Sequence, residues 1–159
     1  MADDSVDVLL VEDNPADVEL TLHALHRNSL AQRIHIARDG EEALDYIFCR
    51  RAYDTRNFDH QPKLILLDLK LPKVDGLTVL ARLKNDPRTK LIPVIILTSS
   101  KEDTDLVRSY QWGANSYIQK PVDFGQFCEA VKQLGLYWLL MNRPAPPSAV
   151  PAQPRDQSK

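Results

Sequence analysis

Five polar residues follow short apolar stretches of this chain, and together they offer carboxylates, a hydroxyl and an ammonium group. They are Glu12, Asp13, Asp68, Thr98 and Lys120. Three carboxylates at one site repel one another and need a cation, and their oxygens suit a hard ion such as Mg²⁺, which also takes phosphate oxygens and water. The hydroxyl of Thr98 and the compact charge of Lys120 would bind an anion beside that metal. Asp68 would then be placed as a nucleophile toward a phosphoryl group, and the product would be an acyl phosphate.

The run at residues 64–67 leads directly into Asp68. Four apolar residues without alternation are typical of a strand buried on both faces, although a piece of buried helix has the same pattern. Pro72 and Asp75-Gly76 follow soon after and favour a strand end, a loop and a new helix. Ligands bind at the carboxyl edge of open α/β sheets, so Asp68 is a candidate site residue. A carboxylate that only caps a loop is an equally good interpretation of its position.

Strand-like and helix-like patterns alternate along the rest of the chain. Strands are expected at residues 6–11, 34–36, 64–67, 92–97 and 116–119, and helices begin near residues 14, 40, 76, 100 and 124. Five strands that alternate with five helices predict an α/β fold, a doubly wound parallel sheet with helices on both faces. Such a sheet brings all five polar residues to one edge.

Two segments fit this alternation poorly. Residues 50–62 mix basic and aromatic side chains, which is compatible with a binding surface, but a solvated loop is the favoured interpretation. From residue 143 the chain is rich in proline and small polar residues, which predicts a disordered or polyproline-like tail over 143–159. The sequence therefore predicts one domain over residues 1–142, followed by that tail.

Composition excludes several function classes. The net charge of −2 over 159 residues offers no electrostatic basis for nucleic-acid binding. No apolar run approaches the roughly 20 residues of a membrane span, and the acidic start is unlike a signal peptide. Cys49 and Cys128 are far apart and lack metal-site or redox spacing. We expect a reduced, cytoplasmic protein without a membrane partner.

Glu12-Asp13, Asp68, Thr98 and Lys120-Pro121 together resemble the motif set of a two-component receiver domain. The resemblance covers about residues 5 to 142 and implies the flavodoxin-like (βα)5 fold with strand order 2-1-3-4-5. It implies that Asp68 is the phosphoacceptor, with Lys120 binding the phosphoryl group and Thr98 and Tyr117 acting as the switch pair. It also implies a Mg²⁺ site, formed by Glu12, Asp13, Asp68 and the backbone carbonyl of Lys70.

Four further stretches resemble, more narrowly, the single-domain response regulators of bacterial phytochrome histidine kinases. They are residues 39–44, the long connection before Pro62, residues 114–117 and residues 136–140. The implied partner is a phytochrome-type sensor histidine kinase. The 17 residues after 142 are too few for an output domain, so output is expected through protein–protein interaction or a further phosphotransfer. No enzymatic activity is expected beyond phosphotransfer to Asp68 and hydrolysis of the product.

The helix expected at residues 127–141 has more apolar residues than one buried face needs. We expect the surplus to contribute to a homodimer or partner surface on the fourth helix, fifth strand and fifth helix, over residues 103–141.

Other function classes fit less well. A phosphohydrolase of the haloacid dehalogenase type has an aspartate two residues after its nucleophile, where this chain has Lys70. A flavodoxin-like nucleotide binder needs a phosphate-cradling loop after its first strand, and here that loop begins with Glu12-Asp13. An interaction module that works without phosphorylation ranks below an active receiver, because every residue that the chemistry needs is present.

Overall fold

Short, mostly apolar runs form a parallel sheet at the centre of the computed structural model, which describes residues 6–27, 33–99, 102–120, 124–135 and 137–138. The strands are β1 (Val8–Val11), β2 (Ile34–Ala37), β3 (Leu64–Leu67), β4 (Val94–Thr98) and β5 (Ser116–Gln119). They pair in parallel in the order β2-β1-β3-β4-β5, which confirms the predicted flavodoxin-like arrangement. Every residue of β1, β3 and β4 is buried, as expected for strands covered on both faces.

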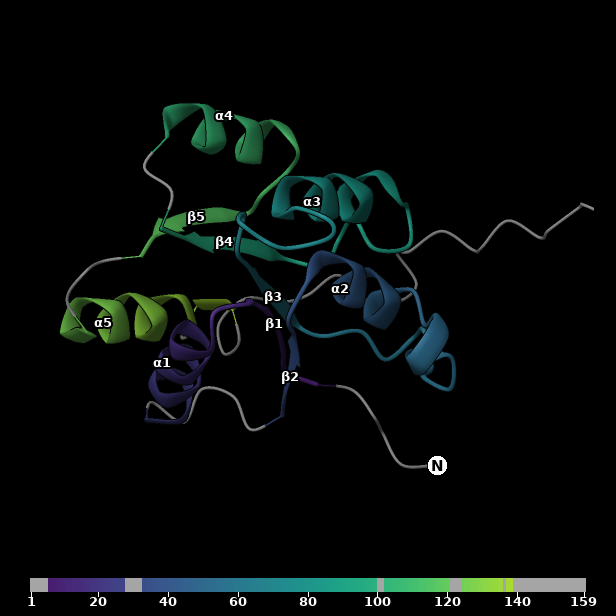
Figure 1. Ribbon diagram of the computed structural model, residues 1–159, viewed down its shortest axis with the longest axis horizontal. Helices are drawn as coiled ribbons and strands as arrows, with labels where there is room; N and C mark the ends of the chain where they lie inside the picture. The colour runs from purple at the N-terminus through teal and green to yellow at the C-terminus, as the bar shows by residue number, and fades with distance from the viewer. Residues whose placement is uncertain (1–5, 28–32, 100–101, 121–123, 136, 139–159) are drawn as a thin grey trace, which may run out of the picture.

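Five α-helices cover the two faces of the sheet. They are α1 (Pro15–Arg27), α2 (Gly40–Ile47), α3 (Gly76–Asn85), α4 (Asp103–Gln111) and α5 (Phe124–Gly135), with a short 3₁₀ helix η1 (Arg51–Tyr53) after α2. Helices α1 and α5 lie together on one side of the sheet, while α2 and α3 lie on the other (Figure 1). In the described part of the chain, no helix has both the length and the apolar content that a membrane span requires.

Alternation along the strands divides the core into two clusters. Leu9 and Ile65 belong to the cluster that includes α2 and α3, whereas Leu10 and Leu66 belong to the one that includes α1 and α5. Cys128 packs into the second cluster as a small apolar side chain. The sheet is thus fixed from both sides, and its carboxyl edge is a rigid base for the side chains that follow the strands.

The starts of α1, α2 and α3 and the end of α4 follow the local sequence signals, whereas α4 begins at Asp103, after Glu102, which makes no side-chain cap. Asn14 accepts a hydrogen bond from the backbone N–H of Ala16 at 2.9 Å and so caps α1. Asp39 and Asp75 cap α2 and α3 in the same way. Gly113, with φ of 97°, ends α4 in the left-handed conformation that glycine adopts without strain.

The connection at residues 50–62 is largely exposed, as predicted for a solvated loop, but several of its side chains also contact the folded core. The guanidinium of Arg56 stacks over the ring of Tyr46 at 3.7 Å from its centroid and donates to the carbonyl of His60 at 2.8 Å. The side-chain amide of Gln61 donates to the carbonyl of Ile47 at 2.8 Å. Because Tyr46 also stacks on His35 of β2, the connection is tied to the edge of the sheet. The sequence pattern showed the basic and aromatic residues of this segment but not their contacts, which depend on the tertiary fold.

The C-terminal predictions lie largely outside the described residues. Helix α5 is described as far as Gly135, whereas the expected helix ran to residue 141. Trp138 packs against the second core cluster, while Tyr137 is 51% exposed. Residues 136 and 139–159, which include the predicted tail at 143–159, are outside the described ranges.

Helix α3 begins in direct contact with the backbone that follows β3. A Cβ atom at Gly76 would lie 2.1 Å from the carbonyl oxygen of Asp68 and 2.6 Å from the Cα of Leu69. The backbone N–H of Gly76 also donates to the carbonyl of Leu69 at 3.0 Å. Only glycine permits this approach, so Gly76 helps to fix the backbone from which Asp68 projects.

We therefore predict that Gly76→Ala destabilises the fold by about 1–3 kcal/mol, because backbone must move to admit the methyl group. At an exposed helical site a change from Gly to Ala normally stabilises the fold by up to about 1 kcal/mol. The sign of the change in the free energy of unfolding therefore distinguishes the close contact at Gly76 from an ordinary helical position. Urea denaturation of wild type, Gly76→Ala and the control Gly125→Ala, whose glycine is exposed on α5, measures the difference. An equally stable Gly76→Ala would show that the close approach is not required.

Candidate functional site

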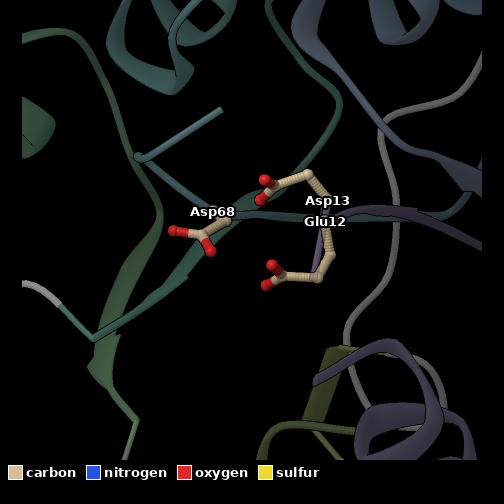
Figure 2. A group of neighbouring side chains, drawn as sticks. All are labelled: Glu12, Asp13 and Asp68. Atoms are coloured by element: carbon tan, nitrogen blue, oxygen red, sulfur yellow. The ribbon is translucent and has the colours of Figure 1, made fainter. Parts of the chain in front are cut away.

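Three carboxylates meet where β1 and β3 end. Glu12 and Asp13 directly follow β1, Asp68 directly follows β3, and the two strands are adjacent and in register. Carboxylate oxygens of the three residues lie within 4.8 Å of one another, and Figure 2 shows the side chains turned toward a common point. Glu12 and Asp68 are buried, whereas Asp13 is exposed. The predicted acidic cluster therefore forms, with one open side.

Backbone hydrogen bonds hold this edge in place. The N–H of Asp68 donates to the carbonyl of Val11 at 3.0 Å, which continues the pairing of β3 with β1 beyond the last paired residues. The N–H of Lys70 donates to Oδ1 of Asp68 at 3.2 Å, and that of Asn14 donates to Oε1 of Glu12 at 3.1 Å. Two of the three carboxylates are thus oriented by the backbone of their own loops.

Lys120 places an ammonium group inside the cluster. It follows β5, and its side chain is only 9% exposed. Its Nζ donates to Oε2 of Glu12 at 2.5 Å and to Oδ2 of Asp68 at 3.2 Å, and its third partner is Oδ2 of Asp17 at 3.1 Å. The three N–H donors of the ammonium therefore have three carboxylate acceptors.

Asp17 is a site residue that the sequence analysis missed. It lies in the first turn of α1, the helix that starts just after Glu12-Asp13, and its side chain is 35% exposed. An acidic residue in the first turn of a helix is ordinarily explained by its favourable interaction with the helix dipole, so its position did not suggest a second role. Its spacing from Asp13, one helical turn along the chain, was the available signal.

The two buried carboxylates have pKa values that are shifted in opposite directions. Burial raises the pKa of Glu12 to about 7, and its hydrogen bond with Asp68 adds to the increase while Lys120 opposes it. Burial also acts to raise the pKa of Asp68, but the net shift is downward. The hydrogen bond from Glu12, the charge of Lys120, the N–H of Lys70 and the Thr98 side chain outweigh burial. Asp68 is therefore held as the carboxylate anion.

Burial works to lower the pKa of Lys120, but the hydrogen bond to Glu12 and the charges of Asp68 and Glu12 raise it overall. The lysine is thus cationic wherever the cluster is ionised. Four acidic side chains, Glu12, Asp13, Asp17 and Asp68, share this edge with the single ammonium group. The edge of the sheet therefore has more acidic groups than cations to pair with them.

The hydroxyl of Thr98 completes the edge from β4. Thr98 is fully buried and donates its hydrogen bond to Asp68. Its carbonyl accepts from the backbone N–H of Lys120 at 2.7 Å, so β4 and β5 remain paired up to the site. Tyr117 lies on β5 opposite Ile96, two register steps before the pair of Thr98 with Gln119, and is half-buried against the first core cluster. The structure therefore brings Thr98 to Asp68 and leaves Tyr117 on the adjacent strand.

Residues 8–132 match the family model described as the response regulator receiver domain. The chain belongs to this receiver family of two-component signalling. The match covers the sheet and nearly all of the described helices, and it includes every residue of the acidic edge.

Relatives of this receiver domain are similar over most of their length. The probable methanogenesis regulatory protein FilR2 of Methanothrix harundinacea is 42% identical over 147 residues, which cover 92% of this chain and 92% of FilR2. The response regulator Rcp1 of Synechocystis sp. is 36% identical over 132 residues, or 83% of this chain and 88% of Rcp1.

Solved structures agree with the receiver fold. The crystal structure of the Mn²⁺-bound form of Rcp1 has a TM-score of 0.80 at 34% identity and covers 87% of this chain and 98% of that chain. The crystal structure of the phosphorylated cyanobacterial phytochrome response regulator RcpA has a TM-score of 0.81 at 38% identity, with 88% and 98% covered.

The donor set of this receiver domain fits a hard divalent cation. Glu12, Asp13 and Asp68 offer oxygen ligands only, and the exposed position of Asp13 leaves a path to solvent. A cation held there would also supply the positive charge that the edge lacks. Lys70 is exposed in the loop after Asp68, and the role of its carbonyl as a further ligand stays a prediction.

We predict that Mg²⁺ stabilises the wild-type receiver domain, because a cation that binds the folded cluster shifts the unfolding equilibrium. At ten times its Kd the gain is about 1.4 kcal/mol, or roughly 3–6 °C in Tm for a domain of this size. Asp13→Asn removes one exposed ligand and should lose most of the gain, whereas the exposed, distant Asp54→Asn should keep it. Thermal unfolding with a Mg²⁺ series measures this. Equal shifts in both variants would contradict a metal site at the cluster.

Proposed function

We propose that this chain is a stand-alone response regulator that accepts a phosphoryl group from a histidine kinase on Asp68. One observation carries the proposal. Asp68 is a buried carboxylate held as the anion between the ammonium of Lys120 and the hydroxyl of Thr98, beside two further acidic side chains. An anionic oxygen nucleophile with positive charge and a donor beside it suits attack on phosphorus.

The proposed transfer balances as a substitution at phosphorus. An Oδ atom of Asp68 forms a bond to phosphorus, and the bond from phosphorus to the donor breaks, which frees the kinase imidazole or, from acetyl phosphate, acetate. Mg²⁺ bound by Glu12, Asp13, Asp68 and the Lys70 carbonyl would neutralise phosphoryl charge. Lys120, which contacts Asp68 at 3.2 Å, would stabilise the same charge as a positioned cation, and Thr98 would donate to a phosphoryl oxygen. The preference for Mg²⁺ follows from the oxygen-only donor set, and the Mn²⁺-bound form of Rcp1 supports a divalent ion.

Similarity to RcpA supports a phytochrome-type sensor kinase as the partner. RcpA is described as a phytochrome response regulator that was crystallised in its phosphorylated form, and it is 38% identical over 88% of this chain. The narrower sequence resemblance noted at residues 39–44 and 114–117 agrees with that assignment. We propose residues 1–142 as the functional receiver unit.

We predict that wild type incubated with acetyl phosphate and Mg²⁺ gains the mass of one phosphoryl group and that Asp68→Asn gains none. The amide keeps the shape of the side chain but lacks the anionic oxygen that attacks phosphorus. Intact-mass spectrometry measures labelling, Asp54→Asn serves as the exposed control, and a chelator should suppress the gain in every sample. Undiminished labelling of Asp68→Asn would mean that the acceptor is another residue.

Signal output is proposed to pass through the face formed by α4, β5 and α5. Helix α4 carries exposed apolar side chains, namely Leu106, Val107 and Tyr110, and Tyr137 is 51% exposed beyond α5. Thr98 adjoins this face because β4 pairs with β5. We propose that Thr98 is drawn toward the phosphoryl group and that Tyr117 responds, so phosphorylation changes a homodimer or partner contact on this face.

We predict a homodimer that Tyr137→Glu weakens, because a charge in an apolar contact must be desolvated. Sedimentation at about 10–100 μM, with and without phosphodonor, measures the monomer fraction. Leu91→Glu places the same charge at an exposed apolar residue outside the proposed face and is the control. Thr98→Ala should still be labelled but should lose the effect of the phosphodonor on the dimer. Monomeric wild type under both conditions would remove the dimer claim.

A further inference from the structure

Lys70 contacts both the acceptor carboxylate and helix α4. It lies two residues after Asp68, and its backbone N–H donates to Oδ1 of Asp68 at 3.2 Å. Its ammonium points to α4, where Nζ lies 3.8 Å from Oδ2 of Asp105. A single residue therefore joins the loop after β3 to the helix that carries the exposed apolar side chains.

The two ends of this ion pair differ in freedom. The side chain of Asp105 is 13% exposed and is fixed within α4, whereas that of Lys70 is 65% exposed. The lysine has a flexible four-carbon stem with a strongly hydrated charge at its end, so it can exchange one anion for another with little rearrangement. An exposed pair of this kind shifts an equilibrium by only about 1.4- to 5-fold, which suits a contact that must be broken and remade.

We propose that Lys70 is a positioning residue whose ammonium is shared between Asp105 and the charge at Asp68. The inference rests on the proposed function, because phosphorylation replaces the single negative charge of Asp68 with about one and a half to two negative charges. That extra charge draws the ammonium of Lys70 away from Asp105. Helix α4, which carries the exposed Leu106 and Val107, then loses one tie to the acceptor loop.

Removing the pair from either end separates this role from a merely structural one. Lys70→Met and Asp105→Asn both break the tie, so both should raise amide hydrogen exchange in α4 about two- to five-fold in the unphosphorylated protein. Their effects on labelling by acetyl phosphate should be opposite. Lys70→Met removes a cation that attracts the dianionic donor and should slow labelling, whereas Asp105→Asn frees that cation and should speed it.

Lys73→Met is the matched control. Lys73 lies in the same loop and is similarly exposed, but its ammonium pairs with Asp39 at 3.6 Å and with Glu41 at 4.0 Å, both outside α4. It should leave both α4 exchange and labelling rate at wild-type values. This control excludes the possibility that the loss of any positive charge in the loop produces the changes expected for Lys70→Met.

The experiment combines hydrogen-exchange mass spectrometry of α4 with the initial rate of phosphoryl mass gain in all four proteins. Raised exchange in both pair variants with opposite changes in labelling rate supports the proposal. If α4 of Lys70→Met exchanges at the wild-type rate, the proposal for Lys70 is overturned, even if Asp68 proves to be the phosphoacceptor. Labelling rates that change in the same direction in both variants overturn it as well. Absence of labelling in every protein, wild type included, contradicts the proposed function itself and removes the switching role of Lys70 with it.

Discussion

The buried ammonium of Lys120 is the interaction on which the site depends. Transferring a charge into a protein interior costs several kcal/mol unless it is paired, and this ammonium has three carboxylate partners at 2.5 to 3.2 Å. The same charge offsets the repulsion between Glu12 and Asp68 and helps to keep Asp68 ionised. Because the carboxylates still outnumber the cation, the edge retains a demand for positive charge. That remaining demand explains why a site of this composition suits a divalent ion and a phosphoryl group together.

The scaffold serves this interaction by bringing four strand ends to one place. Parallel pairing of β1 with β3 sets Glu12 beside Asp68, and pairing of β4 with β5 sets Thr98 beside Lys120. Close contact of Gly76 with the backbone of Asp68 and Leu69 then fixes the acceptor loop from the side of α3. The acceptor is thus rigid on the side of the sheet, while Lys70 connects its loop to the buried Asp105 of α4, the helix that carries exposed apolar side chains.

Sequence pattern predicted the sheet, its carboxyl edge and the residues gathered there, because apolar runs that end in polar residues depend on local order alone. The strand order and the receiver family came from the joint occurrence of Glu12-Asp13, Asp68, Thr98 and Lys120-Pro121. Pattern did not reveal that Asp17 turns to Lys120, that Lys70 reaches Asp105, or that Arg56 packs on Tyr46. Each of these is a charged residue, and sequence alone cannot distinguish a solvated charge from one that tertiary structure pairs.

The most direct test of the central claim is a double-mutant cycle between Lys120 and Asp68, measured by urea denaturation in the presence of a chelator. Lys120→Met should destabilise wild type by about 3 kcal/mol or more, since it leaves buried carboxylates unpaired. In the Asp68→Asn background the same change should cost at least about 1 kcal/mol less, because one of those carboxylates is then neutral. Additive effects, within about 0.5 kcal/mol, would contradict the account, because they would mean that the ammonium and the acceptor carboxylate do not stabilise each other.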